Sequence, residues 1–180
     1  MARFSVAAYQ KMTETGILSE ADRVELLEHY VVLKMPRNPL HDSTIQGMVR
    51  PLLHALPAGW DLRIQSAITL SDSQPEPDLA VVRGSAFDYR TQHPTSADVG
   101  LAIQVADSSL LRDQRDKSRI YARAGIPVNW ADRTIEVYEQ PQAGKTPVYD
   151  SVRTYRVEES VPLLLAGTAT ASLDAKSVLG

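Results

Sequence analysis

Two short runs of the chain are apolar at almost every position, and they constrain the fold more than any other feature. One run covers residues 79–82, and the other covers residues 100–106, with Gln104 as its polar member. A strand that is apolar throughout is covered on both faces, so these runs predict central strands of a sheet. A helical pattern follows over residues 112–124 and ends at Gly125.

Weaker patterns indicate the rest of the fold. Residues 5–15 and 42–56 have helical spacing, and Pro51 predicts a kink or a break in the second helix. Residues 67–70 are expected to continue the sheet, and the tail over 166–180 shows little pattern beyond a short terminal helix. Further strands are predicted at residues 30–33, 60–65, 128–130, 134–138 and 148–157. This order predicts an α+β fold, with a mixed central sheet flanked by helices.

Length and composition set the class of protein. The chain has 180 residues, and we expect residues 1–180 to form one domain. It has no cysteine, which excludes disulfides, thiolate zinc sites and cysteine nucleophiles. No apolar run approaches the roughly 20 residues that span a bilayer, so a cytoplasmic protein without membrane contact is expected. The net charge of −3 means that a nucleic-acid partner would need a local basic patch.

Three polar residues stand on or beside the predicted central elements. Asp78 follows a proline at the start of the strand over 79–82, where a turn aspartate is the common alternative. Gln104 lies inside an apolar strand, either as a hydrogen-bonded core amide or as a functional group. Lys117 lies four residues after Asp113 on the following helix, a spacing that also suits a surface ion pair.

Two further candidates precede them in the chain. Glu25 lies in an apolar segment, and His41 lies just before the second predicted helix. A carboxylate could bind a hard cation and a histidine could act as a base, although a lone histidine is more often structural. Arg112, Arg115 and Arg119 add positive charge that could meet phosphates or simply solvate an exposed helix face.

The order of these residues suits phosphodiester hydrolysis. Oxygen ligands would hold Mg²⁺, which polarises the phosphate and lowers the pKa of a bound water. A lysine would position that water or offset the charge that grows on phosphorus.

The sequence resembles the Uma-two (Uma2) family of putative restriction endonucleases, formerly a domain of unknown function, in the PD-(D/E)XK superfamily. The resemblance covers nearly the whole chain, and the segment over 121–127 is its most specific part. It is carried by residues 4–9, 23–28, 41, 76–82, 103–109, 113, 117, 121–127, 130 and 134–138.

The resemblance implies a restriction-endonuclease-like core and hydrolysis of DNA with a divalent cation, Mg²⁺ or Mn²⁺. Asp78 matches the motif aspartate, and Lys117 matches the family lysine, displaced onto the helix. Asp78 and Gln104 would be the metal ligands, and Glu25 and His41 match further polar residues of the site. Two symmetric sites match the two strands of DNA, so a homodimer is a reasonable arrangement.

The chain departs from the family pattern at several positions. Gln104 replaces a glutamate, Glu28-His29-Tyr30 replaces an Asp-Gly-Glu turn, and the glutamate usual before Trp130 is absent. These changes suit a weakened or catalytically inactive copy that binds DNA or another partner. They equally suit a site rebuilt around Glu76, Asp107 or Asp113. A small-molecule hydrolase ranks low, because the sequence has no nucleophile elbow and no phosphate-cradling glycine-rich loop.

Overall fold

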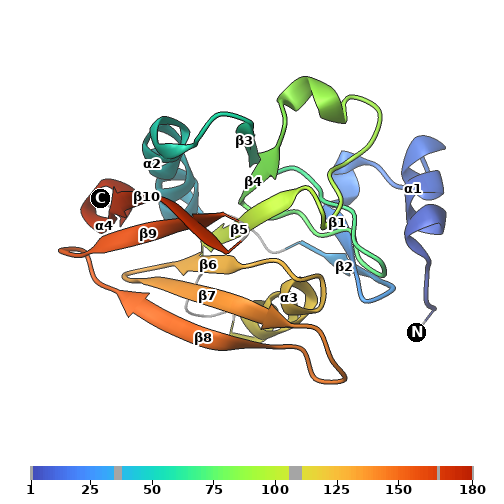
Figure 1. Cartoon of the computed structure of the whole chain (residues 1–180). Helices are drawn as coiled ribbons and strands as arrows, with labels where there is room; N and C mark the ends of the chain where they lie inside the picture. The colour runs from blue at the N-terminus through green and yellow to red at the C-terminus, as the bar shows by residue number, and fades with distance from the viewer. Residues whose placement is uncertain (1, 35–37, 106–110, 166, 180) are drawn as a thin grey trace.

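A six-stranded mixed sheet forms the centre of the computed structural model, which describes residues 2–34, 38–105, 111–165 and 167–179 (Figure 1). Its strands lie in the order β3 (Trp60–Ile64), β4 (Leu79–Arg83), β5 (Val99–Val105), β6 (Val128–Ala131), β7 (Ile135–Gln142) and β8 (Val148–Tyr155). β5 and β6 are parallel, and the other neighbours are antiparallel. A parallel pair needs a crossover, which α3 (Leu111–Arg123) provides. The predicted α+β class is confirmed.

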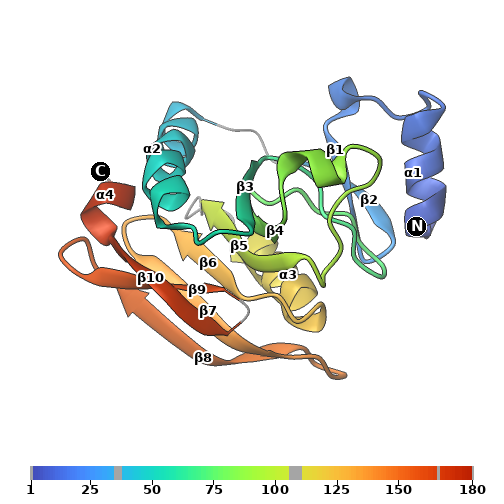
Figure 2. The same ribbon diagram turned by 45° about the horizontal axis from the view of Figure 1, so that its top comes forward.

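Each face of the sheet has its own apolar core. Alternate side chains of a strand point to opposite faces, so Leu79 and Val81 of β4 join one core while Ala80 and Val82 join the other. The first core is completed by α2 (Pro39–Ala55), the hairpin of β9 (Ser160–Leu165) and β10 (Thr168–Asp174), and α4 (Ala175–Leu179). The second core is completed by α3, which lies on the other side of the sheet from α2 (Figure 2).

The helix α2 runs unbroken through Pro51, so the expected break is absent. Met48 and Leu52, on either side of the proline, are buried in the first core and hold the helix together at the cost of one backbone hydrogen bond. The Asn38 side chain caps the helix by accepting the N–H of His41. His41 therefore lies in the first turn of α2 and not before the helix, as the sequence pattern suggested.

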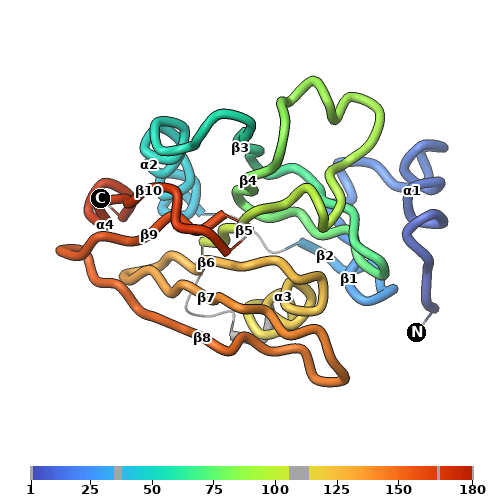
Figure 3. The backbone as a smooth tube through the Cα atoms, in the orientation of Figure 1, coloured from blue at the N-terminus to red at the C-terminus, as the bar shows by residue number. Residues whose placement is uncertain are grey.

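The N-terminal elements lie together at one end of the molecule (Figures 1 and 3). They are α1 (Val6–Glu14), a 3-10 turn (Glu20–Asp22), β1 (Val24–Leu27) and β2 (Tyr30–Leu33). Ser5 caps α1 by accepting the N–H of Ala8. The antiparallel pair β1–β2 joins the rest of the chain through a bridge between Leu26 and Gln74.

One expectation about strands is wrong, and one strand near the C-terminus was not predicted. Residues 67–70 form a loop with one isolated bridge, between Thr69 and Thr95, and do not continue the sheet. The weakly patterned tail contains β10, which pairs with β9 before the short terminal helix α4. Among the described residues, no helix is long and apolar enough to cross a membrane.

Candidate functional site

Asp78 and Gln104 lie opposite each other at one end of the central strands. Leu79 pairs with Ile103 in the antiparallel register of β4 and β5, so Asp78 and Gln104 occupy the next pair. Residues directly opposite in an antiparallel pair place their side chains on the same face. The N–H of Val105 donates to Oδ2 of Asp78 at 2.9 Å, which fixes the carboxylate at this strand end.

The shared face is the one that α3 covers. Ala80 and Ala102 lie two residues along the same strands, and both belong to the core under α3. Asp78 and Gln104 therefore point toward the helix that carries Lys117. Side-chain exposure falls to 12% at Asp78 and 10% at Lys117, so the group is nearly closed to solvent.

Lys117 forms a buried ion pair with Glu25. Its Nζ lies 3.0 Å from Oε1 of Glu25, whose side chain is 4% exposed. The other oxygen of Glu25 accepts the backbone N–H of Glu76 at 3.0 Å. β1 thus brings a carboxylate with both oxygens engaged to the lysine, and the role of Glu25 in a site stays a prediction.

His41 lies in the first turn of α2, and its side chain contacts Asp78 at the start of β4. Its Nε2 lies 3.4 Å from Oδ1 of Asp78, and its Nδ1 lies 3.6 Å from Oδ1 of Asp42. Nδ1 is buried and has no hydrogen-bond partner within the described parts of the chain. The contact with Asp78 raises the pKa of His41 above its ordinary value, against the opposing effect of burial.

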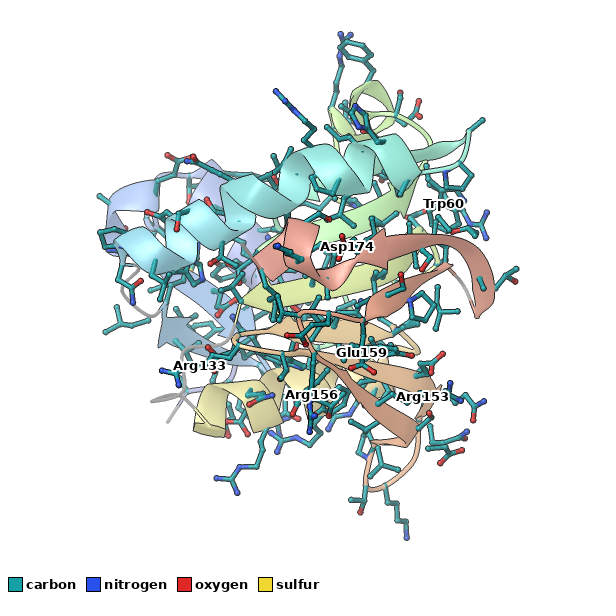
Figure 4. The ribbon with its side chains drawn as sticks, turned by 90° about the vertical axis from the view of Figure 1, so that its left-hand side faces the viewer. Trp60, Arg133, Arg153, Arg156, Glu159 and Asp174 are labelled. Atoms are coloured by element: carbon teal, nitrogen blue, oxygen red, sulfur yellow. The ribbon has the colours of Figure 1, made fainter. Side chains whose placement is uncertain are left out.

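Figure 4 labels Trp60 just beyond the C-terminal end of α2, opposite the end that carries His41.

Tyr121 interacts both with the Asp78–Gln104 pair of the sheet and with Glu25 of the Lys117–Glu25 ion pair. It lies one turn after Lys117 on α3, so both side chains face the sheet. Nε2 of Gln104 donates to the Tyr121 hydroxyl at 2.9 Å. Burial raises the pKa of Tyr121 well above its ordinary value, and the charges of Glu25 and Asp78 raise it further. Gln104, Glu25 and Asp78 thus all interact with this hydroxyl. Lys117 joins the group through Glu25 and His41 through Asp78, and the chemical roles of these residues stay predictions.

Few of the described side chains in the candidate site offer an oxygen atom that could ligate a metal ion. Within the described ranges, no group of three or more histidine, aspartate or glutamate side chains is arranged to hold a metal ion. Glu25 is neutralised by Lys117, and Glu76 forms an ion pair with Lys34. Asp107 lies outside the described residues, as does the side chain of Asp113. Asp78 and Gln104 remain as one carboxylate and one amide.

The arginines of α3 divide into two groups. Arg119 and Arg123 bind the carboxylate of Glu28, and Arg123 also binds Asp72 at 2.8 Å. Arg115 is exposed, and the side chain of Arg112 lies outside the described residues. The interpretation of Arg119 as a phosphate contact therefore competes with its ion pairs to Glu28 and Asp116.

Sequence reasoning did not single out Tyr121 as part of the site. Its spacing of four residues from Lys117 was the available signal, because that spacing places both on one helix face. The approach of β1 to α3 could not be read from any local pattern, since residues 25 and 117 lie far apart in the chain.

Comparisons with known proteins agree on one class. A family model, Uma2, described as "Putative restriction endonuclease", matches residues 6–173. A solved structure titled as a putative nuclease belonging to DUF820, from Anabaena variabilis ATCC 29413, superposes with a TM-score of 0.69. The two chains are 13% identical, and the alignment covers 98% of this chain and 97% of that one, so the likeness shows a shared fold. No curated protein matches the chain.

Proposed function

The chain belongs to the Uma2 family of putative restriction endonucleases, and from that membership we propose that it is a metal-dependent DNA endonuclease that hydrolyses phosphodiester bonds. One observation supports the proposal: Asp78 and Gln104 share the sheet face that α3 covers, and α3 carries Lys117, which is buried against Glu25. A carboxylate, a second oxygen donor and an amine in that arrangement suit phosphate hydrolysis.

The donor set fits a cation that keeps most of its water. Mg²⁺ is usually held through one or two carboxylates, with waters and substrate phosphates as its other ligands. Asp78 would hold it, and the oxygen of Gln104 would be a weaker second ligand. When bound, such an ion polarises the phosphate and lowers the pKa of a bound water.

Lys117 supplies positive charge beside that position. The pair with Glu25 holds Nζ in place, and both side chains are nearly buried. In the proposed reaction Lys117 stabilises the negative charge of the transition state. Glu25 is then a positioning residue, because its two oxygens are occupied by Lys117 and by the N–H of Glu76.

His41 completes the arrangement from α2. Its Nε2 is close enough to Asp78 to orient the carboxylate.

A plasmid-nicking assay with Mg²⁺ or Mn²⁺ tests this function. The wild type is expected to convert supercoiled DNA to open circles, and Asp78→Ala is expected to lose at least about 100-fold in rate. Asp132→Ala is the matched control, because Asp132 is an exposed aspartate between β6 and β7. Equal cleavage by wild type and Asp78→Ala would contradict the assignment.

The second candidate is a catalytically inactive DNA-binding domain on the same fold. The amide of Gln104, which takes the place of the family glutamate and is hydrogen-bonded to Tyr121, favours it. This function predicts retention of DNA that weakens as salt rises, with no product under any divalent metal.

A further inference from the structure

Tyr121 is a fully buried tyrosine that the proposed mechanism does not use. Its exposure is 0%, yet its hydroxyl reaches the polar group formed by Gln104, Asp78 and Glu25. A phenol hydroxyl in an otherwise apolar core costs stability unless it has a partner, and Gln104 is that partner. The hydroxyl and the amide thus satisfy each other at the centre of the candidate site.

The direction of this hydrogen bond decides whether the oxygen or the NH₂ group of the Gln104 amide points away from Tyr121. An amide donates through nitrogen and accepts through oxygen, whereas a carboxylate only accepts. Because Nε2 of Gln104 donates to Tyr121, its Oε1 is directed away from the hydroxyl. The opposite orientation would leave an NH₂ group, which cannot bind a cation.

We propose that Tyr121 is a positioning residue: its hydroxyl holds the Gln104 amide in the orientation that leaves Oε1 for a cation beside Asp78. The inference rests on the proposed function for the identity of the ligand. The orientation of the amide is a property of the chain itself and is tested separately. A phenol can also donate a hydrogen bond to a carboxylate, so the same hydroxyl would position a glutamate at residue 104.

Side-chain amide NMR tests the orientation without any metal. The Gln104 NH₂ signals are identified by their loss in Gln104→Glu. Tyr121→Phe is expected to speed their hydrogen exchange about tenfold, as loss of one hydrogen bond should. Tyr149→Phe is the matched control, because that tyrosine donates its hydroxyl proton to the carbonyl of Ile126 and not to Gln104. It should leave the Gln104 signals unchanged.

Calorimetric titration with Mn²⁺ tests the consequence for binding. Tyr121→Phe is expected to weaken Mn²⁺ affinity about 10- to 100-fold, the usual effect of removing a group that orients a ligand. The wild type could bind no Mn²⁺ while Tyr121→Phe still speeds exchange of the Gln104 amide. That result would contradict the proposed metal-dependent function and support the role of Tyr121 in orienting the amide. If amide exchange is the same in Tyr121→Phe and the wild type, the positioning role is overturned, whatever the metal does.

Discussion

Residue 104 sets the charge of the candidate site. Asp78 supplies one negative charge there, while Glu25 is balanced by Lys117. Gln104→Glu adds a second carboxylate oxygen donor on the same face of the sheet. We expect this variant to bind Mg²⁺ or Mn²⁺ about tenfold more tightly and to cleave DNA faster, since hard cations prefer carboxylates to amides.

The control for this prediction is Gln92→Glu, because Gln92 is exposed in the loop between β4 and β5. It adds the same charge without a new donor beside Asp78. Unchanged Mn²⁺ affinity in Gln104→Glu, measured by calorimetry, would show that residue 104 does not ligate a cation.

The Lys117–Glu25 pair is expected to dominate the stability of the site. Both side chains are at most 10% exposed, so removing one charge leaves the other buried without its counter-ion. Lys117→Met should lower the free energy of unfolding by about 3–5 kcal/mol. The double variant Lys117→Met with Glu25→Gln should recover most of that loss, because no unpaired charge remains and the amide oxygen can still accept the N–H of Glu76.

Urea denaturation measures both variants, and a surface pair provides the comparison. Lys11 and Glu14 lie 3.4 Å apart with side chains 72% and 66% exposed, so Lys11→Met should change stability by no more than about 0.5 kcal/mol. If Lys117→Met costs no more than Lys11→Met, the pair is better solvated than its burial indicates.

At the scale of elements, the sequence predicted what local patterns encode. The apolar runs became the central strands β4 and β5, and the helical spacing over residues 112–124 became α3. The position of Gln104 within β5 followed from the same run. These features could be predicted because burial on both faces leaves a mark in consecutive residues.

The missed elements depend on contacts between distant segments. β10 is exposed at most of its positions and is held by its pairing with β9, so its own sequence has no buried periodicity. Pro51 predicts a kink or a break by local rules, but packing of Met48 and Leu52 against the sheet keeps α2 continuous, so no break occurs. The encounter of Glu25 with Lys117 likewise depends on how β1 lies against α3.

The turn between β1 and β2 shows how one departure from the family pattern is accommodated. Glu28 and His29 have φ of +48° and +72°, so both central residues of this two-residue hairpin turn are left-handed. Such turns favour Asn-Gly or Asp-Gly, and this chain has Glu28-His29 instead. The strand pairing is nevertheless kept, with Tyr30 opposite Leu27.

His29→Gly is therefore expected to stabilise the protein. It relieves about 1–2 kcal/mol of left-handed strain, at an entropic cost of roughly 0.5–1 kcal/mol and with loss of the contact between Nδ1 and the Phe4 carbonyl. The net gain should be about 0.5 kcal/mol by thermal or urea unfolding. His29→Ala, which loses the imidazole but keeps the left-handed strain, should be less stable than His29→Gly. The reverse order of stability would show that the backbone at residue 29 is not strained.

At the scale of the whole molecule, ion pairs fasten the N-terminal hairpin to α3. Oε1 of Glu28 accepts from Nε of Arg119 at 3.1 Å and from Nη2 of Arg123 at 2.8 Å. Arg123 continues the network to Asp72. The β1–β2 turn, α3 and the loop before β4 are thus joined by one set of charges around Glu28.

This network predicts how stability depends on pH. The hydrogen bond from Arg119 holds the pKa of Glu28 below its ordinary value of 4.5, with Arg123 adding to the effect against burial. A carboxyl whose pKa is lower in the folded state contributes stability above its unfolded pKa, and loses it as pH falls through the folded value. Glu28→Gln removes this contribution, so the wild type should exceed it in unfolding free energy by about 1 kcal/mol at pH 7.

The difference should stay constant between pH 7 and about 5, and then shrink toward zero below the ordinary pKa of a glutamate. Urea unfolding of both proteins across this range measures it, and titration of the other carboxyls cancels because both chains contain them. Glu20→Gln is the matched control, since Glu20 is exposed in the turn before β1 and should show no pH-dependent difference. A difference between wild type and Glu28→Gln that persists unchanged to pH 3 would mean that the hairpin is held to α3 by its apolar and backbone contacts, with the arginines contributing nothing to the attachment.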